Sequence, residues 1–380
     1  MKILFLTDGI TPFVQGGMQR HSQLVIESLA KRGNEITVYH FVKPGLEVDY
    51  SKAFTKEALE NISFECFEYQ DLGWFPGHYL GAQKEISKRY FNKLRSTVKS
   101  FDFIYTKGFM GWALLKQKSQ LGIEVPIGVK FHGMNMFQKQ ADFKSDLSKF
   151  LLRPTTSWIL KNSDFIFSYG GKITDIIHDQ CGTSIVEVPT GIESDWLVDR
   201  PNVNNPIRRF VFVGRFDRVK GLPELYDALN LLIKLHSDWE FHFIGPIPSE
   251  HQIKMKQTVF HGPIYDKEKL QTLIASNDIL VNCSISEGMP NVILEAMSQG
   301  LAIVATDVGA TSVLVKNGLN GMLIEDSTPK RISDALYTAL LKSDSELTYW
   351  KCESLKMANE MTWESIGPRL ETAIQKCIRG

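Results

Sequence analysis

The stretch "DILVNCSISEGMPNVILEAMSQG" (278–300) joins an apolar segment to a short helical segment and decides the type of fold. Its first part, 278–283, is a continuous apolar run, which is typical of a parallel strand buried on both faces. From Pro290 onward the residues have a helical pattern that closes at Gly300. Two acids bracket the junction, Glu287 in the loop and Glu295 in the helix. Such a junction indicates an α/β sheet that binds a ligand at the carboxyl ends of its strands.

The same alternation of strand and helix runs along the whole chain, which predicts doubly wound parallel sheets. Apolar, strand-like runs occur at 2–7, 35–41, 62–67, 102–106, 125–131, 164–168, 184–188, 209–213, 239–244, 257–261, 278–283 and 302–306. Helical patterns lie at 18–32, 82–99, 109–121, 222–236 and 329–343. The Pro- and Asn-rich stretch 195–209 is typical of a linker. We therefore expect a first domain at 1–195 and a second at 206–362.

The composition excludes several classes of protein. The 380 residues are 43% hydrophobic, which is enough for two cores, and 43 basic residues balance 43 acidic ones, so no charge excess favours nucleic acid. Five cysteines without a C-x-x-C pair disfavour a disulfide framework or a zinc site and fit a reducing cytosol. The opening run "KILFLT" is too short for a signal peptide, and no apolar run reaches the roughly 18 residues of a membrane span. We expect a cytoplasmic protein.

Two segments carry groups that suit a phosphate. Gly16 and Gly17 precede a helix, whose N-terminal N–H groups and partial positive charge attract anions, although paired glycines also make ordinary tight turns. In "VFVGRFDRVKG" (211–221), a strand runs into Gly214 and Arg215, and Lys220 follows. A guanidinium and an ammonium at a strand end can hold phosphate oxygens, and the alternative is two solvated surface cations.

The acidic pair of the opening stretch suits a sugar nucleotide. If Pro290 occupies the first helical position, the N–H groups of Gly288 and Met289 point outward. A carboxylate only accepts hydrogen bonds, so Glu287 and Glu295 suit the hydroxyls of a sugar on one side of a phosphate and of a ribose on the other. The alternative is a helix-capping residue and an exposed acid.

Two further strand ends carry candidates. His132 follows the strand 125–131, although a lone histidine is more often structural than catalytic. The loop "EVPTGIE" (187–193) contains Gly191, which would allow a tight turn.

Taken together, the sequence resembles the retaining glycosyltransferases of the family-4 type, which have two Rossmann-like domains facing a cleft, the GT-B architecture. Glu287 and Glu295 resemble the acidic motif of that family, and Arg215 and Lys220 its phosphate pair. His132 resembles its acceptor-side histidine, and the paired glycines its N-terminal loop. "WESI" resembles the start of its C-terminal helix, so we expect 363–380 to pack back on the first domain.

The resemblance implies transfer of a hexose, with retention of configuration, from a nucleotide diphosphate sugar to a glycan or lipid-linked acceptor in cell-surface polysaccharide or glycolipid synthesis. The implied catalytic residues are Glu287, His132, Arg215 and Lys220. The implied donor-binding residues are Gly16, Gly17, Gly214, Arg215, Lys220, Gly288, Met289, Pro290, Asn291 and Glu295. No cofactor is implied, and the absence of an Asp-x-Asp motif favours a reaction without metal.

The sequence departs from the family pattern at one loop, and two alternative functions stay open. The family loop Asn-Gly-(Val/Ile)-Asp is here Thr190-Gly191-Ile192-Glu193, so the amide contact of the family asparagine is missing. A sugar-nucleotide 2-epimerase of the same architecture or a non-catalytic sugar-nucleotide-binding protein would share most of the motifs. A dehydrogenase is disfavoured because G-x-G-x-x-G is absent.

The segment 74–99 suggests a membrane contact. The predicted helix 82–99 carries six cations between 84 and 99 against one acid, and three aromatic residues lie between Trp74 and Tyr79. Cations attract anionic lipid and aromatic side chains seat at the interface. The segment is therefore either a peripheral contact with the inner face of the cell membrane or an ordinary helix with a solvated basic face.

Overall fold

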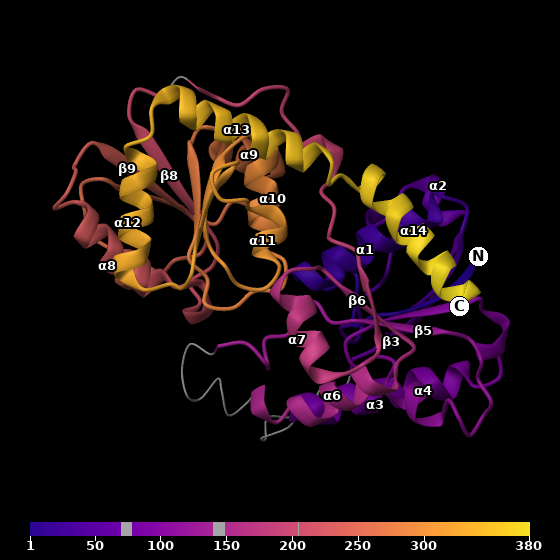
Figure 1. Ribbon diagram of the computed structural model, residues 1–380. Helices are drawn as coiled ribbons and strands as arrows, with labels where there is room; N and C mark the ends of the chain where they lie inside the picture. The colour runs from indigo at the N-terminus through magenta and orange to yellow at the C-terminus, as the bar shows by residue number, and fades with distance from the viewer. Residues whose placement is uncertain (70–77, 140–148, 204) are drawn as a thin grey trace. The chain divides into compact units, whose positions relative to one another are not determined.

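The computed structural model describes residues 1–69, 78–139, 149–203 and 205–380. The chain forms two compact units, each a parallel sheet with helices packed on it (Figure 1). Of these residues, the first unit holds 1–69, 78–137, 149–190 and 363–380, and the second holds 138–139, 191–203 and 205–362.

The sheet of the first unit has seven strands in the order β3-β2-β1-β4-β5-β6-β7, and all pairs are parallel. The strands are β1 (Lys2–Leu6), β2 (Glu35–Val42), β3 (Ile62–Glu68), β4 (Phe103–Lys107), β5 (Ile127–Lys130), β6 (Phe165–Ser168) and β7 (Ser184–Glu187). The strand order reverses between β1 and β4. In open α/β sheets the ligand crevice forms at such a reversal, beside the carboxyl ends of the strands.

The helices of the first unit bury apolar faces against this sheet, as in the core formed by Val25, Ile26 and Leu29 of α1 with Phe5 and Val38. The helices are α1 (Gly17–Ala30), α2 (Lys56–Leu59), α3 (His78–Leu94), α4 (Trp112–Gln117), α6 (Arg153–Asn162), α7 (Lys172–Gln180) and α14 (Trp363–Arg379), with short 3₁₀ turns η1 (Tyr50–Lys52) and η2 (Val98–Ser100).

The second unit repeats the design with six parallel strands in the order β10-β9-β8-β11-β12-β13. Its strands are β8 (Arg208–Val213), β9 (Trp239–Ile244), β10 (Thr258–Gly262), β11 (Ile279–Asn282), β12 (Ala302–Thr306) and β13 (Gly321–Ile324). Its helices are α8 (Leu222–Leu232), α9 (Lys267–Ala275), α10 (Asn291–Ser298), α11 (Thr311–Leu314), α12 (Pro329–Leu340) and α13 (Asp344–Asn359), with η3 (Ser194–Trp196), η4 (Arg218–Lys220) and η5 (Ser249–His251). Here the order reverses between β8 and β11.

The prediction of two doubly wound parallel-sheet domains is confirmed, but some elements differ from the sequence patterns. Strand β13 was not predicted, because it has only four residues, starts at a glycine and lacks a long apolar run. The helix predicted at 82–99 instead begins at His78 and ends at Leu94, and a separate 3₁₀ turn follows. The aromatic residues at 74–77 lie outside the described residues.

The division of the chain falls between Thr190 and Gly191, whereas the sequence suggested 195–206. The segment after Thr190 lies on the second unit because its own side chains and backbone bind there. Asp195 accepts a hydrogen bond from Lys267 at 2.6 Å, and the Val198 N–H donates to the Ser298 carbonyl at 3.1 Å. The Pro- and Asn-rich stretch 195–209, predicted as the linker, therefore falls within the second unit.

The last helix belongs to the first unit. In Figure 1, α14 lies beside α1, far from it in sequence. Ile366, Leu370 and Ile374 of α14 enter the core of that unit. At the helix surface, Glu371 accepts hydrogen bonds from Arg32 at 2.6 Å and from the Asn34 amide at 2.8 Å.

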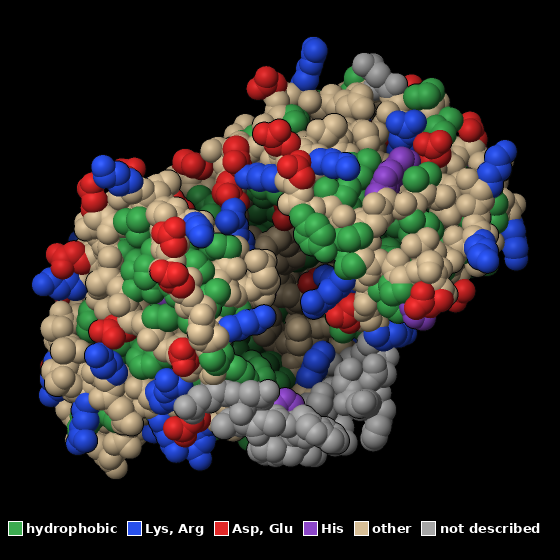
Figure 2. Space-filling view, turned by 180° about the vertical axis from the view of Figure 1, so that it is seen from behind, with side chains coloured by type: hydrophobic (Ala, Val, Ile, Leu, Met, Phe, Trp, Pro, Cys, Tyr) green, Lys and Arg blue, Asp and Glu red, His purple; other side chains and the backbone are tan. Residues whose placement is uncertain are grey.

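The surface carries both signs of charge. On the face drawn in Figure 2, Lys and Arg side chains lie among Asp and Glu side chains, in keeping with 43 of each class. Among the described residues, the helices are all too short or too polar to cross a bilayer.

Candidate functional site

The turn after β8 places the first predicted cation at the reversal of strand order in the second unit. The backbone of Gly214 is held by a hydrogen bond from its N–H to the Ile244 carbonyl at 2.9 Å. Gly245 lies against it so closely that a Cβ there would stand 1.9 Å from the Gly214 carbonyl oxygen. Arg215 leaves this fixed turn with 74% of its side chain exposed and its Nε 3.6 Å from an Asp217 oxygen. The guanidinium is therefore available to a ligand.

Lys220 is held against the next strand by its own short loop. Gly221 has φ +68°, and a Cβ there would stand 2.2 Å from the Cys283 carbonyl oxygen, so this close approach requires glycine. The Ile285 N–H donates to the Val219 carbonyl at 2.8 Å. These contacts fix the Lys220 loop to the segment that follows β11 and leads to Glu287.

The two motifs meet in an ion pair. The Lys220 ammonium donates to Glu287 Oε1 at 2.6 Å, and 27% and 14% of the two side chains are exposed. The sequence assigned Lys220 to phosphate and Glu287 to sugar hydroxyls, and the structure places these two groups in direct contact. A cation beside an acceptor-only carboxylate can bind a phosphate oxygen and a neighbouring hydroxyl at the same time.

Helix α10 begins beside this pair, one residue later than predicted. Pro290 is the cap residue with extended backbone (φ −75°, ψ 104°), and the helix starts at Asn291. The unbonded N–H groups of the first turn therefore start at Asn291, and Gly288 and Met289 belong to the preceding loop. Glu295 lies further along α10 and is partly buried.

A glycine that sequence analysis missed supports the Glu287 loop. Gly309 follows β12 with φ +58°, and a Cβ there would stand 2.3 Å from the Glu287 carbonyl oxygen and 2.4 Å from that of Gly288. Next to it, the Ala310 N–H donates to the Gly288 carbonyl at 2.7 Å. A single glycine in a loop belongs to no sequence motif, so its role could not be recognised from the sequence.

We expect Gly309→Ala to displace the Glu287 loop. A methyl group closer than 3 Å to two backbone carbonyls cannot be accommodated without a shift of the backbone, and the positive φ adds strain. The melting temperature should fall by several degrees, since roughly 1 kcal/mol shifts a midpoint by about 2–4 °C in a domain of this size. Gly318→Ala is the matched control, because its φ is also positive (+76°) but nothing lies within 4 Å of its Cβ position. Equal melting temperatures for the two variants would contradict this role.

In the first unit, the structure brings the glycine loop and His132 together. Gly16 caps α1 with φ +152°, and the helix starts at Gly17, one residue before the predicted start. A Cβ on Gly17 would stand 3.8 Å from His132 Nε2, so the imidazole faces this helix start. Burial, followed by the positive charges of Lys107 and Lys130, lowers the pKa of His132 to about 3. The ring is therefore neutral at physiological pH.

Three buried groups that sequence analysis missed surround this histidine. Lys107 and Lys130 each have 1% exposure, and so does Tyr169. Lys107 Nζ lies 3.1 Å from His21 Nδ1, and Tyr169 OH lies 2.9 Å from His132 Nδ1. Burial lowers the pKa of Lys107 to about 7. Each lysine is the last residue of an apolar strand, and this position was the only indication in the sequence that it could lie at a site. A single lysine at the end of an apolar run is usually interpreted as the boundary of the strand.

The loop 190–193 does not form the tight turn that Gly191 suggested. Gly191 is absent from the described glycines with positive φ, and Ile192 forms an isolated bridge with Thr362 instead. Glu193 lies 3.7 Å from Lys267 on the surface of the second unit, and Thr190 is buried. Within the second unit, this bridge pairs the segment after Gly191 with the last residue of the unit, Thr362.

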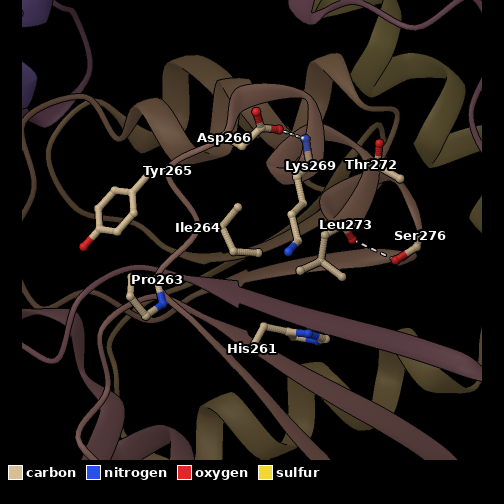
Figure 3. A pocket seen from close by; sticks show the side chains of 9 residues that line it. All are labelled: His261, Pro263, Ile264, Tyr265, Asp266, Lys269, Thr272, Leu273 and Ser276. Atoms are coloured by element: carbon tan, nitrogen blue, oxygen red, sulfur yellow. Dashed lines mark hydrogen bonds between the residues drawn. The ribbon is translucent and has the colours of Figure 1, made fainter.

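A pocket of about 820 Å³ in the second unit lies apart from the predicted residues. Figure 3 shows Lys269 and Leu273 of α9 on one side of it and His261 of β10 on the other. None of the residues proposed from the sequence lines it. Among the described residues, no group of three or more His, Cys, Asp and Glu side chains is placed to hold a metal ion.

Part of the second unit matches a known protein family. Residues 207–342, which include Arg215, Lys220, Glu287 and Glu295, match the family "Glycosyl transferases group 1". A curated relative, the putative teichuronic acid biosynthesis glycosyltransferase TuaC of Bacillus subtilis, is 30% identical over 34% of this chain and 32% of its own length. The chain thus spans about a third of the length of that relative.

Solved structures match over the whole chain. Sucrose-phosphate synthase from Thermosynechococcus elongatus has a TM-score of 0.77 and 16% identity over 100% of this chain and 99% of its own. Anabaena HepE in complex with UDP-glucose has a TM-score of 0.65 and 16% identity over 99% and 100% of the two chains. The fold is therefore GT-B. Within it, residues 207–342 are similar to the glycosyl transferases of group 1.

Proposed function

We propose that the protein is a retaining glycosyltransferase that moves a hexose from a nucleotide diphosphate sugar to a glycan or lipid-linked acceptor. The observation that carries the proposal is the contact of Lys220 with Glu287 at 2.6 Å, beside the reversal of strand order between β8 and β11. A cation that can bind phosphate and a carboxylate that can bind hydroxyls lie together where the strand order reverses. This pair suits a ligand in which a phosphate is joined to a sugar.

The proposed roles follow from where each group lies in its own unit. Arg215, which is largely exposed, and Lys220 bind the diphosphate and stabilise the charge that develops on it as the sugar leaves. Glu287 accepts hydrogen bonds from the hydroxyls of the donor sugar. Glu295 accepts hydrogen bonds from the ribose. In the first unit, Gly17 offers backbone N–H groups to the diphosphate, and His132 contacts the sugar.

Retention of configuration is proposed from the resemblance and from the chemistry of Glu287. A covalent mechanism needs a free carboxylate nucleophile on the face of the sugar opposite the leaving group. Glu287 is engaged with Lys220, which suits it to binding rather than to nucleophilic attack. We propose that the acceptor attacks from the side of the leaving phosphate, which takes the acceptor proton. No cofactor is needed for this chemistry, and the positive charges of Arg215 and Lys220 take the place of a metal.

The donor is proposed to be a nucleotide diphosphate hexose. The solved structure of HepE holds UDP-glucose in a similar fold, which makes UDP-sugars the first donors to test. The name of the relative TuaC refers to teichuronic acid biosynthesis, which favours cell-surface polysaccharide or glycolipid synthesis. All five cysteines are free, in keeping with a cytoplasmic location.

Incubation with a panel of nucleotide sugars and acceptor glycans tests the function. A transferase releases nucleotide diphosphate and forms a new glycoside whose anomeric configuration matches the donor. A 2-epimerase would return an altered sugar, and a binding protein would raise the melting temperature without turnover. We expect the first result, and either of the other two would overturn the proposal.

We also propose that α3 brings the protein to the anionic inner face of the cell membrane. Its apolar residues Ile86, Tyr90 and Leu94 are buried within the first unit, whereas cations and Tyr79 lie at its surface and can contact lipid. Lys84, Lys88 and Lys93 of this helix are exposed. Binding should therefore be electrostatic and sensitive to salt.

Vesicle co-sedimentation tests this contact. Replacing Lys84, Lys88 and Lys93 by glutamate should abolish binding to anionic vesicles at low salt, because each cation near the surface contributes about 1 kcal/mol. Arg89 is left unchanged because it donates to the Glu68 carbonyl at 2.8 Å. The matched control replaces Lys234, Lys254 and Lys256, three exposed lysines of the second unit. Without binding of the unaltered protein to anionic vesicles at low salt, a soluble acceptor becomes the better candidate.

A further inference from the structure

The hydroxyl of Tyr169 defines which nitrogen of His132 faces the glycine loop. Tyr169 follows β6 directly and His132 lies two residues beyond β5, so the neighbouring strands bring them together at one sheet edge. The hydroxyl lies 2.9 Å from Nδ1, and the rings are nearly perpendicular, at 88°. Nδ1 is therefore engaged within the protein, whereas Nε2 faces Gly17.

The direction of this hydrogen bond follows from the protons available. Tyr169 is 1% exposed, and burial raises the pKa of its phenol well above the ordinary value, so the phenol keeps its proton. Among the residues that the structure describes, His132 Nδ1 is the hydrogen-bond partner of that hydroxyl. If Nδ1 carried a hydrogen, the buried phenol proton would lose its acceptor, and a buried donor without an acceptor is costly.

Lys130 holds the Tyr169 ring in place. Its Nζ lies 3.7 Å from the centre of that ring and donates to the Val188 carbonyl at 2.9 Å, so the ring packs against a fixed side chain. Burial lowers the pKa of Lys130 well below its ordinary value, so the direction of the hydrogen bond rests on the phenol proton and not on a charge at Lys130. Burial is also the main cause that lowers the pKa of His132 and keeps its ring neutral. A neutral imidazole that accepts at one nitrogen carries its hydrogen on the other.

We infer that Tyr169 is a positioning residue that holds His132 in the Nε2–H tautomer, so that His132 donates a hydrogen bond to a hydroxyl oxygen of the donor sugar. The hydrogen bond to the sugar rests on the proposed function, whereas the assignment of the tautomer is independent of it. The absence of a side chain at Gly17 leaves the Nε2–H open, since a Cβ there would already stand 3.8 Å from this nitrogen.

Long-range nitrogen–proton NMR correlations of the histidine rings test the tautomer without any substrate. The chain has nine histidines, and the His132 signals are assigned by their loss in His132→Gln. We expect hydrogen on Nε2 in the wild type and a mixture of tautomers in Tyr169→Phe. Hydrogen on Nδ1 in the wild type, or the same tautomer in both proteins, would overturn the inference.

The kinetic arm tests the role toward the sugar. Tyr169→Phe should lower kcat about tenfold, as expected for a lost or misdirected neutral hydrogen bond, with unchanged affinity for free nucleotide diphosphate. Tyr226→Phe is the control, because it removes a buried hydroxyl that has no hydrogen-bond partner among the described residues. An unchanged kcat in Tyr169→Phe would overturn the role of His132 as a sugar donor. A wild type with the expected tautomer but no transferase activity would refute the proposed function and leave the tautomer standing.

Discussion

Lys220→Ala is expected to lower kcat at least about 100-fold, the typical cost of removing a group that stabilises developing charge. The leaving diphosphate gains negative charge as the sugar departs, and Lys220 is the cation that the structure fixes beside Glu287. Its removal also leaves the Glu287 carboxylate without its partner, so a negative charge would face the phosphate. Lys220→Arg should recover only part of the rate, because a guanidinium is planar and larger than an ammonium.

Lys234→Ala is the matched control, since it removes an exposed lysine from the same unit. Thermal unfolding of each variant checks that loss of activity is not loss of fold. EDTA should leave most of the wild-type activity, because Arg215 and Lys220 supply the positive charge. Activity abolished by EDTA and restored by manganese, or a Lys220→Ala variant within a few-fold of the wild type, would refute this assignment.

The sequence predicted that Lys220 and Glu287 follow the carboxyl ends of strands, but it did not predict that the two side chains are in contact. Lys220 and Glu287 are 67 residues apart and follow different strands. Continuous apolar runs predicted those strands, and the family resemblance named both side chains. Their contact depends on β8 and β11 being neighbours and on Gly221 approaching Cys283, which are properties of strand order and backbone packing. Short-range patterns do not specify which strands pair.

The same limit explains the residues that were missed. Gly309 acts through backbone contacts with Glu287 and Gly288, which come from a different loop. Tyr169 looks like the end of an apolar strand, and only the position of His132 at 2.9 Å gives its hydroxyl a role. Strong periodicity found the long elements, whereas the short strand β13 depends on pairing with β12.

Glu295→Ala is expected to weaken binding of nucleotide diphosphate by roughly 10- to 150-fold, because a hydrogen bond to a charged group contributes about 1.5–3 kcal/mol. Glu295 lies within α10, one turn and more beyond the helix start that adjoins Glu287. A ligand bound through its phosphates at Lys220 therefore has one acid near its sugar and the other further along the helix. Glu287→Gln should mainly lower kcat, since its partner is the sugar that moves.

The two variants separate the roles because each should change a different measurement. Calorimetry with free nucleotide diphosphate contains no donor sugar, so Glu295→Ala should weaken that binding and Glu287→Gln should leave it nearly unchanged. Glu268→Ala controls for the loss of one negative charge, since Glu268 is exposed on α9. If Glu295→Ala binds free nucleotide diphosphate as the wild type does, the ribose is not its partner. Because Glu287 also pairs with Lys220, a large loss of nucleotide affinity in Glu287→Gln would mean that the carboxylate acts by orienting the cation rather than by holding the sugar.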